Sequence, residues 1–217
     1  MKKTELKALN RFSLTASYNA FNKMTKIKNL NIVLASNSPR RRELLAGLDL
    51  DFRVEVIKGI KEGYPKDLPA EQVPLFISKE KAAAYKIPTD ELLITADTVV
   101  ILGNEIMGKP KDADDARRML HELSGKTHHV VTGVCLTTAE KQVAFSDITA
   151  VTFRELTDKE IQYYIERYKP FDKAGAYGIQ EWIGYVGVRS IEGSFFNVMG
   201  LPVERLWEEL CKLDIAL

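Results

Sequence analysis

Apolar positions along the chain form short runs and helical stripes that follow one another from residue 31 onward. The first run ends at Ser36 and predicts a buried strand. Ser38 and Pro39 follow as an N-cap residue and a proline at the first helical position. A helix should therefore begin there, and Gly47 should weaken its end.

Later segments continue to alternate between strand patterns and helix patterns. The predicted strands cover residues 52–57, 92–101, 129–138 and 143–153. The predicted helices begin near Val73, after Asp112, after Thr157 and at Pro202. Thr157 and Glu160 have the spacing of a capping box, whereas the glycine-rich residues 174–200 predict strand and turn. Because helices and strands interleave throughout, the pattern predicts an α/β fold.

The composition excludes several classes of protein. The chain has 217 residues, of which 45% are hydrophobic and 28% charged, and these proportions exclude disorder, collagen and coiled coil for the chain as a whole. The formal net charge of +1 provides no strong field for nucleic acid or an anionic membrane. No apolar stretch approaches the roughly 20 residues that span a bilayer.

The charge is unevenly distributed along the chain. Residues 1–30 contain seven basic side chains and one acidic side chain, which leaves 24 basic and 29 acidic side chains for residues 31–217. A body with this negative excess needs local cations or a metal ion to bind a polyanion. The first segment lacks the apolar core and cleavage site of a targeting signal. We interpret residues 1–30 as an N-terminal extension and residues 31–217 as a single domain.

The cysteines and histidines point to no metal or disulfide site. Cys135 and Cys211 lie in apolar or helical patterns and are interpreted as small buried hydrophobic residues. Two cysteines without a CxxC pair favour a reducing cytoplasm. His121, His128 and His129 lack the spacing of metal ligands.

The segment from Ser36 to Arg42 joins a strand end, a hydroxyl-rich turn and three consecutive arginines in the first helical turn. Free backbone N–H groups, the positive helix end and bidentate guanidinium groups are suited to bind phosphate. Cations oppose the dipole at a helix N-terminus, so their presence favours an anion nearby, although a solvated face is the alternative. Consecutive helical residues point about 100° apart, so one arginine should be at the surface.

Asp97 interrupts an otherwise apolar strand pattern. An isolated buried carboxylate is too costly, so this one must be paired, hydrogen-bonded or bound to a metal ion. A structural ion pair and a functional carboxylate are equally compatible with this residue alone. Lys109, which lies between glycine and proline after a predicted hairpin, favours the functional interpretation.

The segment 172–180 combines small residues with one polar side chain. Gly175 and Gly178 allow a ligand to approach the backbone, and Gln180 can read a base edge with one acceptor and two donors. A glycine-rich bend between strands is the alternative interpretation. The chain contains neither a P-loop nor a GxGxxG motif.

Taken together, these segments resemble the Maf family of nucleoside triphosphate pyrophosphatases, once described as septum formation inhibitors. The matching stretches are LASNSPRRRELL (34–45), EKA (80–82), ITADTVV (94–100), GKPKDADDARRML (108–120), LSGKTHHVVTGV (123–134), DKAGAYGIQ (172–180) and GSFFNVMGLP (193–202). The resemblance covers about residues 31–213. It implies a mixed central sheet flanked by helices, with two lobes around a nucleotide-binding cleft, as in inosine triphosphatases.

The resemblance also implies roles for individual residues. Asp97 corresponds to the proton acceptor. The residues associated with the choice of pyrimidine are Arg40, Thr98 and Gln180. The residues expected to bind phosphate are Ser36, Arg41, Lys81 and Lys109, which leaves Arg42 on another face of the helix.

One departure from the family pattern concerns a candidate metal site. The family often has two acids where this chain has Lys61 and Glu62. Only Glu62 is therefore carried over, as a metal ligand together with Asp97. The expected cofactor is a divalent cation, Mg²⁺ or alternatively Mn²⁺, which would bridge phosphate oxygens.

The implied reaction is the attack of water on the α-phosphorus of a nucleoside triphosphate, which gives the monophosphate and pyrophosphate. The DKAGAYGIQ form is similar to the subgroup that prefers dTTP and UTP over 7-methyl-GTP. The implied role is cytoplasmic house-cleaning of modified pyrimidine nucleotides, with a tie to arrest of cell division. Nucleic acid and membrane are not expected as partners, and a homodimer is compatible with the resemblance.

Two alternatives remain open. One is a purine-directed house-cleaning pyrophosphatase on a similar fold, which a panel of triphosphates would separate. The other is a non-catalytic protein that binds a partner in septum formation. Asp97 beside several cations argues against the second, because a binding surface needs no buried carboxylate. Release of pyrophosphate from dTTP and Mg²⁺ would decide between an enzyme and a binding protein.

Overall fold

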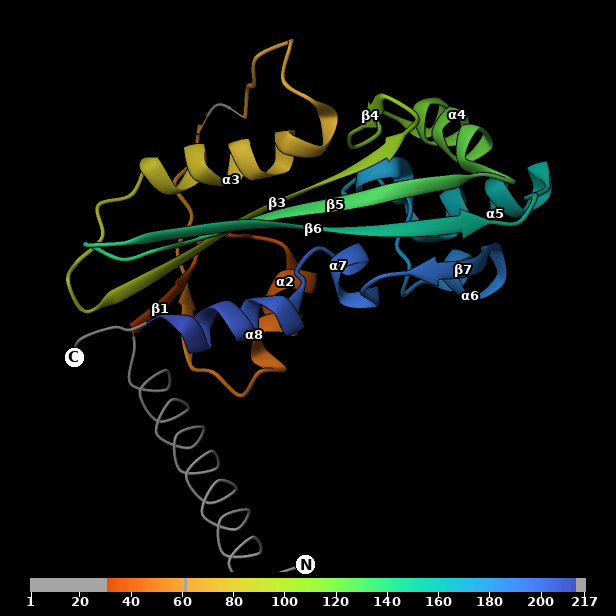
Figure 1. The fold of residues 1–217 in the computed structure, drawn as a ribbon. Helices are drawn as coiled ribbons and strands as arrows, with labels where there is room; N and C mark the ends of the chain where they lie inside the picture. The colour runs from red at the N-terminus through yellow and green to blue at the C-terminus, as the bar shows by residue number, and fades with distance from the viewer. Residues whose placement is uncertain (1–30, 61, 214–217) are drawn as a thin grey trace, which may run out of the picture.

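A computed structural model describes residues 31–60 and 62–213 (Figure 1). The predicted N-terminal extension, residues 1–30, lies outside the described residues. The strands are β1 (Asn31–Leu34), β2 (Phe52–Val54), β3 (Glu91–Leu102), β4 (Glu105–Met107), β5 (Thr127–Thr137), β6 (Gln142–Phe153) and β7 (Val188–Glu192). The helices are α2 (Pro39–Ala46), α3 (Val73–Ala83), α4 (Ala113–Leu123), α5 (Asp158–Tyr168), α6 (Trp182–Gly187), α7 (Phe195–Met199) and α8 (Val203–Lys212), with 3₁₀ turns at Ala70–Gln72 and Ala174–Ala176. None of these helices is long and apolar enough to cross a membrane.

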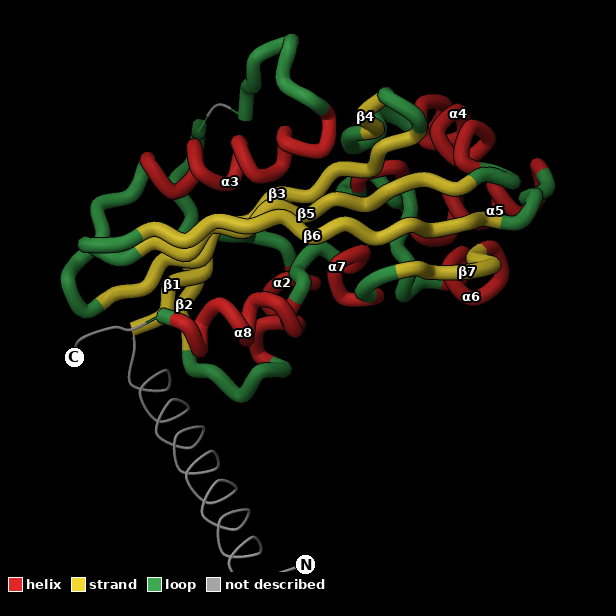
Figure 2. The backbone as a smooth tube through the Cα atoms, in the orientation of Figure 1, coloured by secondary structure: helices red, strands yellow, loops and turns green. Residues whose placement is uncertain are grey.

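The described strands form one mixed sheet in the order β2-β1-β3-β5-β6-β7, and β4 also pairs with β3. β1 runs parallel to β2 and β3, whereas the other pairs are antiparallel. The long strands β3, β5 and β6 extend through both ends of the molecule (Figure 1). At one end α3 covers one face and α2 and α8 lie below the other, while α4, α5 and α6 lie at the far end (Figure 2). The predicted α/β fold with a mixed central sheet is confirmed.

One edge of β3 contains the gap in which the site forms. Along this edge β1 pairs with residues 91–94, and β4 pairs with residues 100–102. No described strand pairs with residues 95–99 on this edge, so Asp97 and Thr98 lie between two short strands. The opposite edge of β3 is paired with β5 along residues 93–101, which include the whole of this gap. The strand is therefore held rigidly while its side toward the gap stays open to a ligand.

Successive side chains of β3 point to opposite faces of the sheet, as the pleat requires. Thr95 faces α3, since its hydroxyl donates to the Ser78 carbonyl of that helix at 2.7 Å. Asp97 points to the same face. Thr98 points to the other face, toward Arg41 of α2. The two neighbouring site residues therefore act on opposite faces at the same open edge.

Helix α3 packs closely against Gly133, the residue of β5 that pairs with Asp97. A Cβ atom on this glycine would lie 2.3 Å from Leu75 N and 2.4 Å from Pro74 C. Only glycine leaves room for the helix at this distance. Because α3 also carries Lys81, this close packing brings the lysine within reach of the carboxylate.

Most local predictions are confirmed. Ser38 caps α2, and Pro39 is the first residue of the helix. Asp112 caps α4, and Thr157 and Glu160 form the capping box of α5. These caps satisfy backbone N–H groups that the first helical turn leaves without partners.

Two predictions were wrong in extent. β2 ends at Val54 rather than at residue 57, because this edge strand pairs only with the last three residues of β1. Residues 174–200 contain α6 and α7 in addition to β7, where the glycines predicted only strand and turn. Ser194 caps α7, and Gly200 ends it with φ of 115°. Helices of five or six residues are too short to display a helical period.

Candidate active site

A cleft of about 840 Å³ opens at the gap in β3. Its walls come from the β1–α2 loop and the start of α2, residues 56–60 with Glu62 and Tyr64, α3, the loop after β4, residues 172–180 and the end of α7. The nine predicted site residues all line it, namely Ser36, Arg40, Arg41, Glu62, Lys81, Asp97, Thr98, Lys109 and Gln180. Segments far apart in the sequence therefore converge on one cavity.

The cleft is basic, although the body of the protein is acidic. Six basic side chains line it, those of Arg40, Arg41, Lys58, Lys81, Lys109 and Lys173. The acidic side chains in the lining are those of Glu62, Asp97 and Asp172. A basic excess in a partly enclosed space attracts polyanions.

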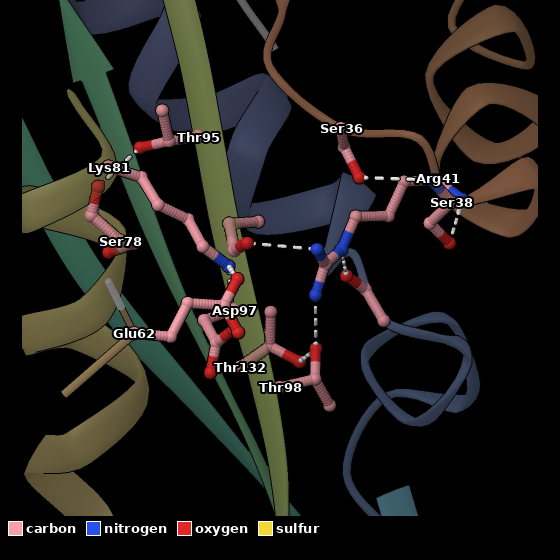
Figure 3. A network of polar contacts seen from close by, with 12 residues as sticks. Ser36, Ser38, Arg41, Glu62, Ser78, Lys81, Thr95, Asp97, Thr98 and Thr132 are labelled. Atoms are coloured by element: carbon pink, nitrogen blue, oxygen red, sulfur yellow. Dashed lines mark hydrogen bonds and ion pairs between the residues drawn. The ribbon is translucent and has the colours of Figure 1, made fainter. Parts of the chain in front are cut away.

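Asp97 and Glu62 share Lys81 as a partner (Figure 3). The Lys81 Nζ atom lies 2.9 Å from Asp97 Oδ1 and 2.8 Å from Glu62 Oε1. Asp97 and Lys81 are 15% and 13% exposed, so the prediction that this carboxylate is paired is confirmed. Burial disfavours the charge of Glu62, but the hydrogen bond and the charge of Lys81 outweigh burial and hold the pKa of Glu62 below its usual range.

The donor set of this cluster fits a magnesium ion carried in with a phosphate ligand. Asp97 Oδ2 and Glu62 Oε2 accept no hydrogen bond from any residue in 31–60 or 62–213. No group of three or more His, Cys, Asp or Glu in those ranges could hold a metal ion by itself. Mg²⁺ typically binds one or two carboxylates and takes its other ligands from water and substrate phosphates.

Arg41 is held on the other face of β3 by three acceptors (Figure 3). Its Nε donates to the Gly200 carbonyl at 2.7 Å, Nη1 to the Ala96 carbonyl at 2.8 Å, and Nη2 to Thr98 Oγ1 at 2.9 Å. The Ala96 carbonyl lies in the gap of β3, where the guanidinium replaces the N–H of a neighbouring strand. Burial lowers the pKa of Arg41, although an arginine stays charged. Three of its five N–H groups are engaged, which leaves two for a ligand.

The hydroxyl of Thr98 is occupied by a chain of hydrogen bonds. It accepts from Arg41 and lies 2.9 Å from Thr132 Oγ1, which in turn donates to the Asn197 carbonyl at 3.2 Å. Because Thr132 uses its proton on Asn197, Thr98 must donate its own proton to Thr132. Thr98 therefore fixes the position of Arg41 and has no proton left for a base.

The far end of the cleft contains Arg40 and Gln180. Arg40 Nη1 lies 2.9 Å from Asp172 Oδ2, an acidic partner that the sequence did not predict. The Oε1 atom of Gln180 is buried and has no hydrogen-bond partner among the described residues. An unpaired buried acceptor is costly, and an N–H group of a ligand would satisfy it.

Two residues predicted to bind phosphate, and one arginine predicted to face away from the ligand, also have clear positions. Ser36 is buried, and its Oγ accepts from Ser38 N at 3.2 Å. It donates to no residue in 31–60 or 62–213, so its proton can serve a ligand. Lys109 is exposed in the cleft and makes no ion pair with the described residues. Arg42 is exposed and does not line the cleft, which confirms its predicted orientation.

Sequence reasoning missed Lys58, Asp172 and Lys173 as cleft residues. Asp172 and Lys173 belong to the glycine-rich segment that also contains Gln180, so their proximity to that residue was the available signal. Lys58 lies in a loop without periodic pattern, and only the tertiary structure brings it to the cleft.

The chain is similar to known proteins over most of its described length. The family model described as Maf-like protein matches residues 31–213. A dTTP/UTP pyrophosphatase of Phocaeicola vulgatus is 60% identical over 192 residues, which cover 88% of this chain and 100% of that protein. A dTTP/UTP pyrophosphatase of Parabacteroides distasonis is 57% identical over 190 residues, which cover 86% and 98%. The solved Staphylococcus aureus Ham1 protein shares 16% identity with a TM-score of 0.40, over 57% of this chain and 71% of that one, a similarity too low to inform the site.

Proposed function

The chain belongs to the Maf-like protein family, and we propose that it hydrolyses dTTP and UTP to the nucleoside monophosphate and pyrophosphate. The activity of its close relatives supports this substrate class. The observation that carries the proposal is a basic cleft with the paired carboxylate Asp97 at its open strand edge. A triphosphate matches the excess of cations, and a positioned carboxylate can remove a proton from water.

In the proposed reaction, the oxygen of a water molecule bonds to the α-phosphorus. The bond from this phosphorus to the oxygen that bridges to the β-phosphate breaks, and pyrophosphate leaves. Asp97 Oδ2, which accepts from none of the described residues, would accept the proton of the water. Lys81 holds the other carboxylate oxygen at 2.9 Å, so the base is oriented before the substrate arrives.

Cations and hydroxyl groups on the cleft walls would bind the triphosphate. Ser36 offers a hydroxyl proton, Arg41 two N–H groups, and Lys109 an ammonium group without an acidic partner among the described residues. Lys58 adds another positive charge at the rim. These groups would stabilise the negative charge that develops on the leaving pyrophosphate.

We also propose a divalent cation, Mg²⁺ or Mn²⁺, as the cofactor. Glu62 would hold it through its free oxygen, and Asp97 would be a second ligand as the alternative to its role as base. So few protein ligands suit an ion that also binds phosphate. When bound, the ion would offset phosphate charge and increase the electrophilicity of the α-phosphorus. Glu62 is 54% exposed, so this ligand can adjust to a substrate-bound ion.

Gln180 supports a pyrimidine substrate. Thymine and uracil present an N–H group between two carbonyl groups, and a carboxamide can accept from the former and donate to one of the latter. The unpaired Oε1 of Gln180 is the matching acceptor. A site that pairs with a base edge rejects bases that leave its polar groups unpaired.

A house-cleaning role in the cytoplasm is consistent with this activity. The substrates are cytoplasmic nucleotides, and the free thiols of Cys135 and Cys211 suit a reducing compartment. Hydrolysis of pyrimidine triphosphates that carry modified bases would keep them from polymerases.

The test is pyrophosphate release from purified protein with Mg²⁺ and a panel of dTTP, UTP, ATP and GTP. We expect efficient hydrolysis of dTTP and UTP and poor hydrolysis of ATP and GTP. Preference for ATP or GTP would instead support the purine-directed alternative. Absence of pyrophosphate with all four nucleotides would support a non-catalytic protein.

A further inference from the structure

Gln180 lies in a turn that is held by a polar cluster outside the proposed reaction. We define the Tyr164 cluster as the side chains of Tyr164, Lys173 and Glu181. Tyr164 comes from α5, whereas Lys173 and Glu181 flank the glycine-rich segment on either side of Gln180. The relative exposures of the Tyr164 and Lys173 residues are 0% and 8%, and the Glu181 side chain is 20% exposed.

The Tyr164 hydroxyl ties together both ends of the turn that carries Gln180. It accepts a hydrogen bond from Gly178 N at 2.9 Å and donates to Glu181 Oε2. Glu181 N donates to the Gly178 carbonyl at 3.0 Å, so residues 178–181 form a closed turn with Gln180 in third place. Burial and the hydrogen bond to Glu181 raise the pKa of Tyr164, which keeps the proton on the phenol.

Lys173 connects this turn to Arg40. Its Nζ lies 3.1 Å from Glu181 Oε1 and 2.8 Å from Asp172 Oδ1, and Asp172 pairs with Arg40 at 2.9 Å. Burial disfavours the charge of Asp172, but Lys173 and Arg40 outweigh it and lower its pKa. One network of ion pairs therefore runs from Arg40 to Glu181, the residue that follows Gln180 in the chain.

The backbone of the turn is in direct contact with the cluster. A Cβ atom at Gly178 would lie 2.9 Å from Glu181 Cδ and 3.0 Å from Lys173 Cε. The turn cannot move in this direction without displacing both side chains. The cluster therefore restricts where the Gln180 backbone can lie.

The position of Gln180 matters because its carboxamide can pair with two different kinds of base edge. It can pair with the imide edge of thymine or, after exchange of its donor and acceptor, with the amino edge of cytosine. We propose that Glu181 is a positioning residue that, with Lys173 and Tyr164, fixes Gln180 and thereby favours thymine and uracil over cytosine. This inference rests on the proposed function.

The test compares kcat and KM for dTTP and dCTP in the wild type, Glu181→Ala and Glu181→Gln. In Glu181→Ala we expect KM for dTTP to rise about tenfold, the scale of one charge-assisted hydrogen bond, with kcat nearly unchanged. The preference for dTTP over dCTP should fall by a similar factor. Glu181→Gln keeps the size of the side chain and an acceptor for Tyr164, so it should fold and show about a threefold change.

A double-mutant cycle tests whether Glu181 acts through Gln180. Gln180→Ala alone should abolish the preference, and adding Glu181→Ala should change it no further. Glu166→Ala, an exposed acid on the same helix as Tyr164, is the matched control and should match the wild type.

Two results would overturn the inference. One is a wild-type preference for dTTP over dCTP in both Glu181 variants, and the other is full additivity in the cycle. A wild-type protein that does not hydrolyse dTTP would contradict the proposed function instead, so the two failures are distinguishable.

Discussion

At the Asp97 end of the cleft, each ion-paired carboxylate keeps one oxygen free for a ligand. At the Gln180 end, by contrast, the charged side chains pair with one another and hold the turn that carries Gln180. Lys81 binds one oxygen of Asp97 and one of Glu62, and the second oxygens accept from no described residue. At the other end, Asp172 and Glu181 both pair with Lys173.

This difference suits the Asp97 end to the chemical step and the Gln180 end to holding the base in position. A carboxylate with a free oxygen can take a proton or bind a cation, so changes at the Asp97 end should act on kcat. A closed network has no group to offer the reacting atoms, and changes at the Gln180 end should act on KM and on the choice of base. This assignment holds only if changes at the Asp97 end lower kcat and changes at the Gln180 end alter KM and the choice of base.

The largest effect is expected from Asp97→Asn. The amide can still accept from Lys81, so the variant should fold, but it loses the charge and basicity of the carboxylate. We expect kcat for dTTP to fall on the order of 10²-fold or more, the scale of general acid–base catalysis. Asp172→Asn, at the Gln180 end, is the matched control and should keep kcat while KM rises. Full activity in a folded Asp97→Asn protein would make this residue a structural ion-pair partner.

The next effect concerns Arg41, which joins α2 to Ala96 and Thr98 of β3 and to Gly200. Arg41→Ala leaves the carbonyls of Ala96 and Gly200 without their donors. Unpaired buried acceptors destabilise a protein, so the free energy of unfolding should fall by about 3 kcal/mol. Urea denaturation followed by circular dichroism measures this change. A variant as stable as the wild type would show that water replaces the guanidinium at the open edge of β3.

A smaller effect links the Gln180 end to pH. Burial, with a minor contribution from His129, lowers the pKa of His128 from 6.5 to about 4. Its Nε2 lies 2.7 Å from the hydroxyl of Tyr177, a residue of the segment 172–180. The unfolded chain binds a proton below pH 6.5 while the folded protein stays neutral to about pH 4. The contribution of His128 to stability is therefore fully present above pH 6.5. The free energy of unfolding should fall by about 2 kcal/mol between pH 7 and pH 5.

Thermal denaturation across this pH range tests the contribution of His128. His128→Gln should flatten the pH dependence, because glutamine does not titrate. His121→Gln, which changes an exposed histidine, should leave the dependence as in the wild type. An unchanged slope in His128→Gln would assign the pH dependence to carboxylates instead.

The smallest effect is expected from Arg42→Ala. This side chain points away from both ends of the cleft, so stability and kcat/KM for dTTP should change within about 0.5 kcal/mol. Arg40→Ala, two residues earlier, should instead reduce the preference for dTTP, because it breaks the ion pair with Asp172. If Arg42→Ala were the more damaging change, Arg42 rather than Arg40 would be the arginine that contacts the ligand.

Sequence patterns by themselves determined the features that depend on near neighbours. The caps at Ser38, Asp112 and Thr157 follow from residues within three or four positions, because a cap bonds to its own first turn. The apolar run around Asp97 likewise placed this residue in a buried strand, where its carboxylate required a partner. Short helices such as α7 were missed because five residues display no period.

Only the tertiary structure decided which side chains meet. Lys81 lies 16 residues before Asp97, and Arg41 lies 159 residues before Gly200. No local pattern encodes these pairs, because they depend on how α2 and α3 dock on opposite faces of one strand. The same holds for the Tyr164 cluster, whose tyrosine is contributed by a separate helix. Local sequence therefore specified the elements and the kinds of chemistry, while packing between distant segments determined the partners and hence the geometry of the site.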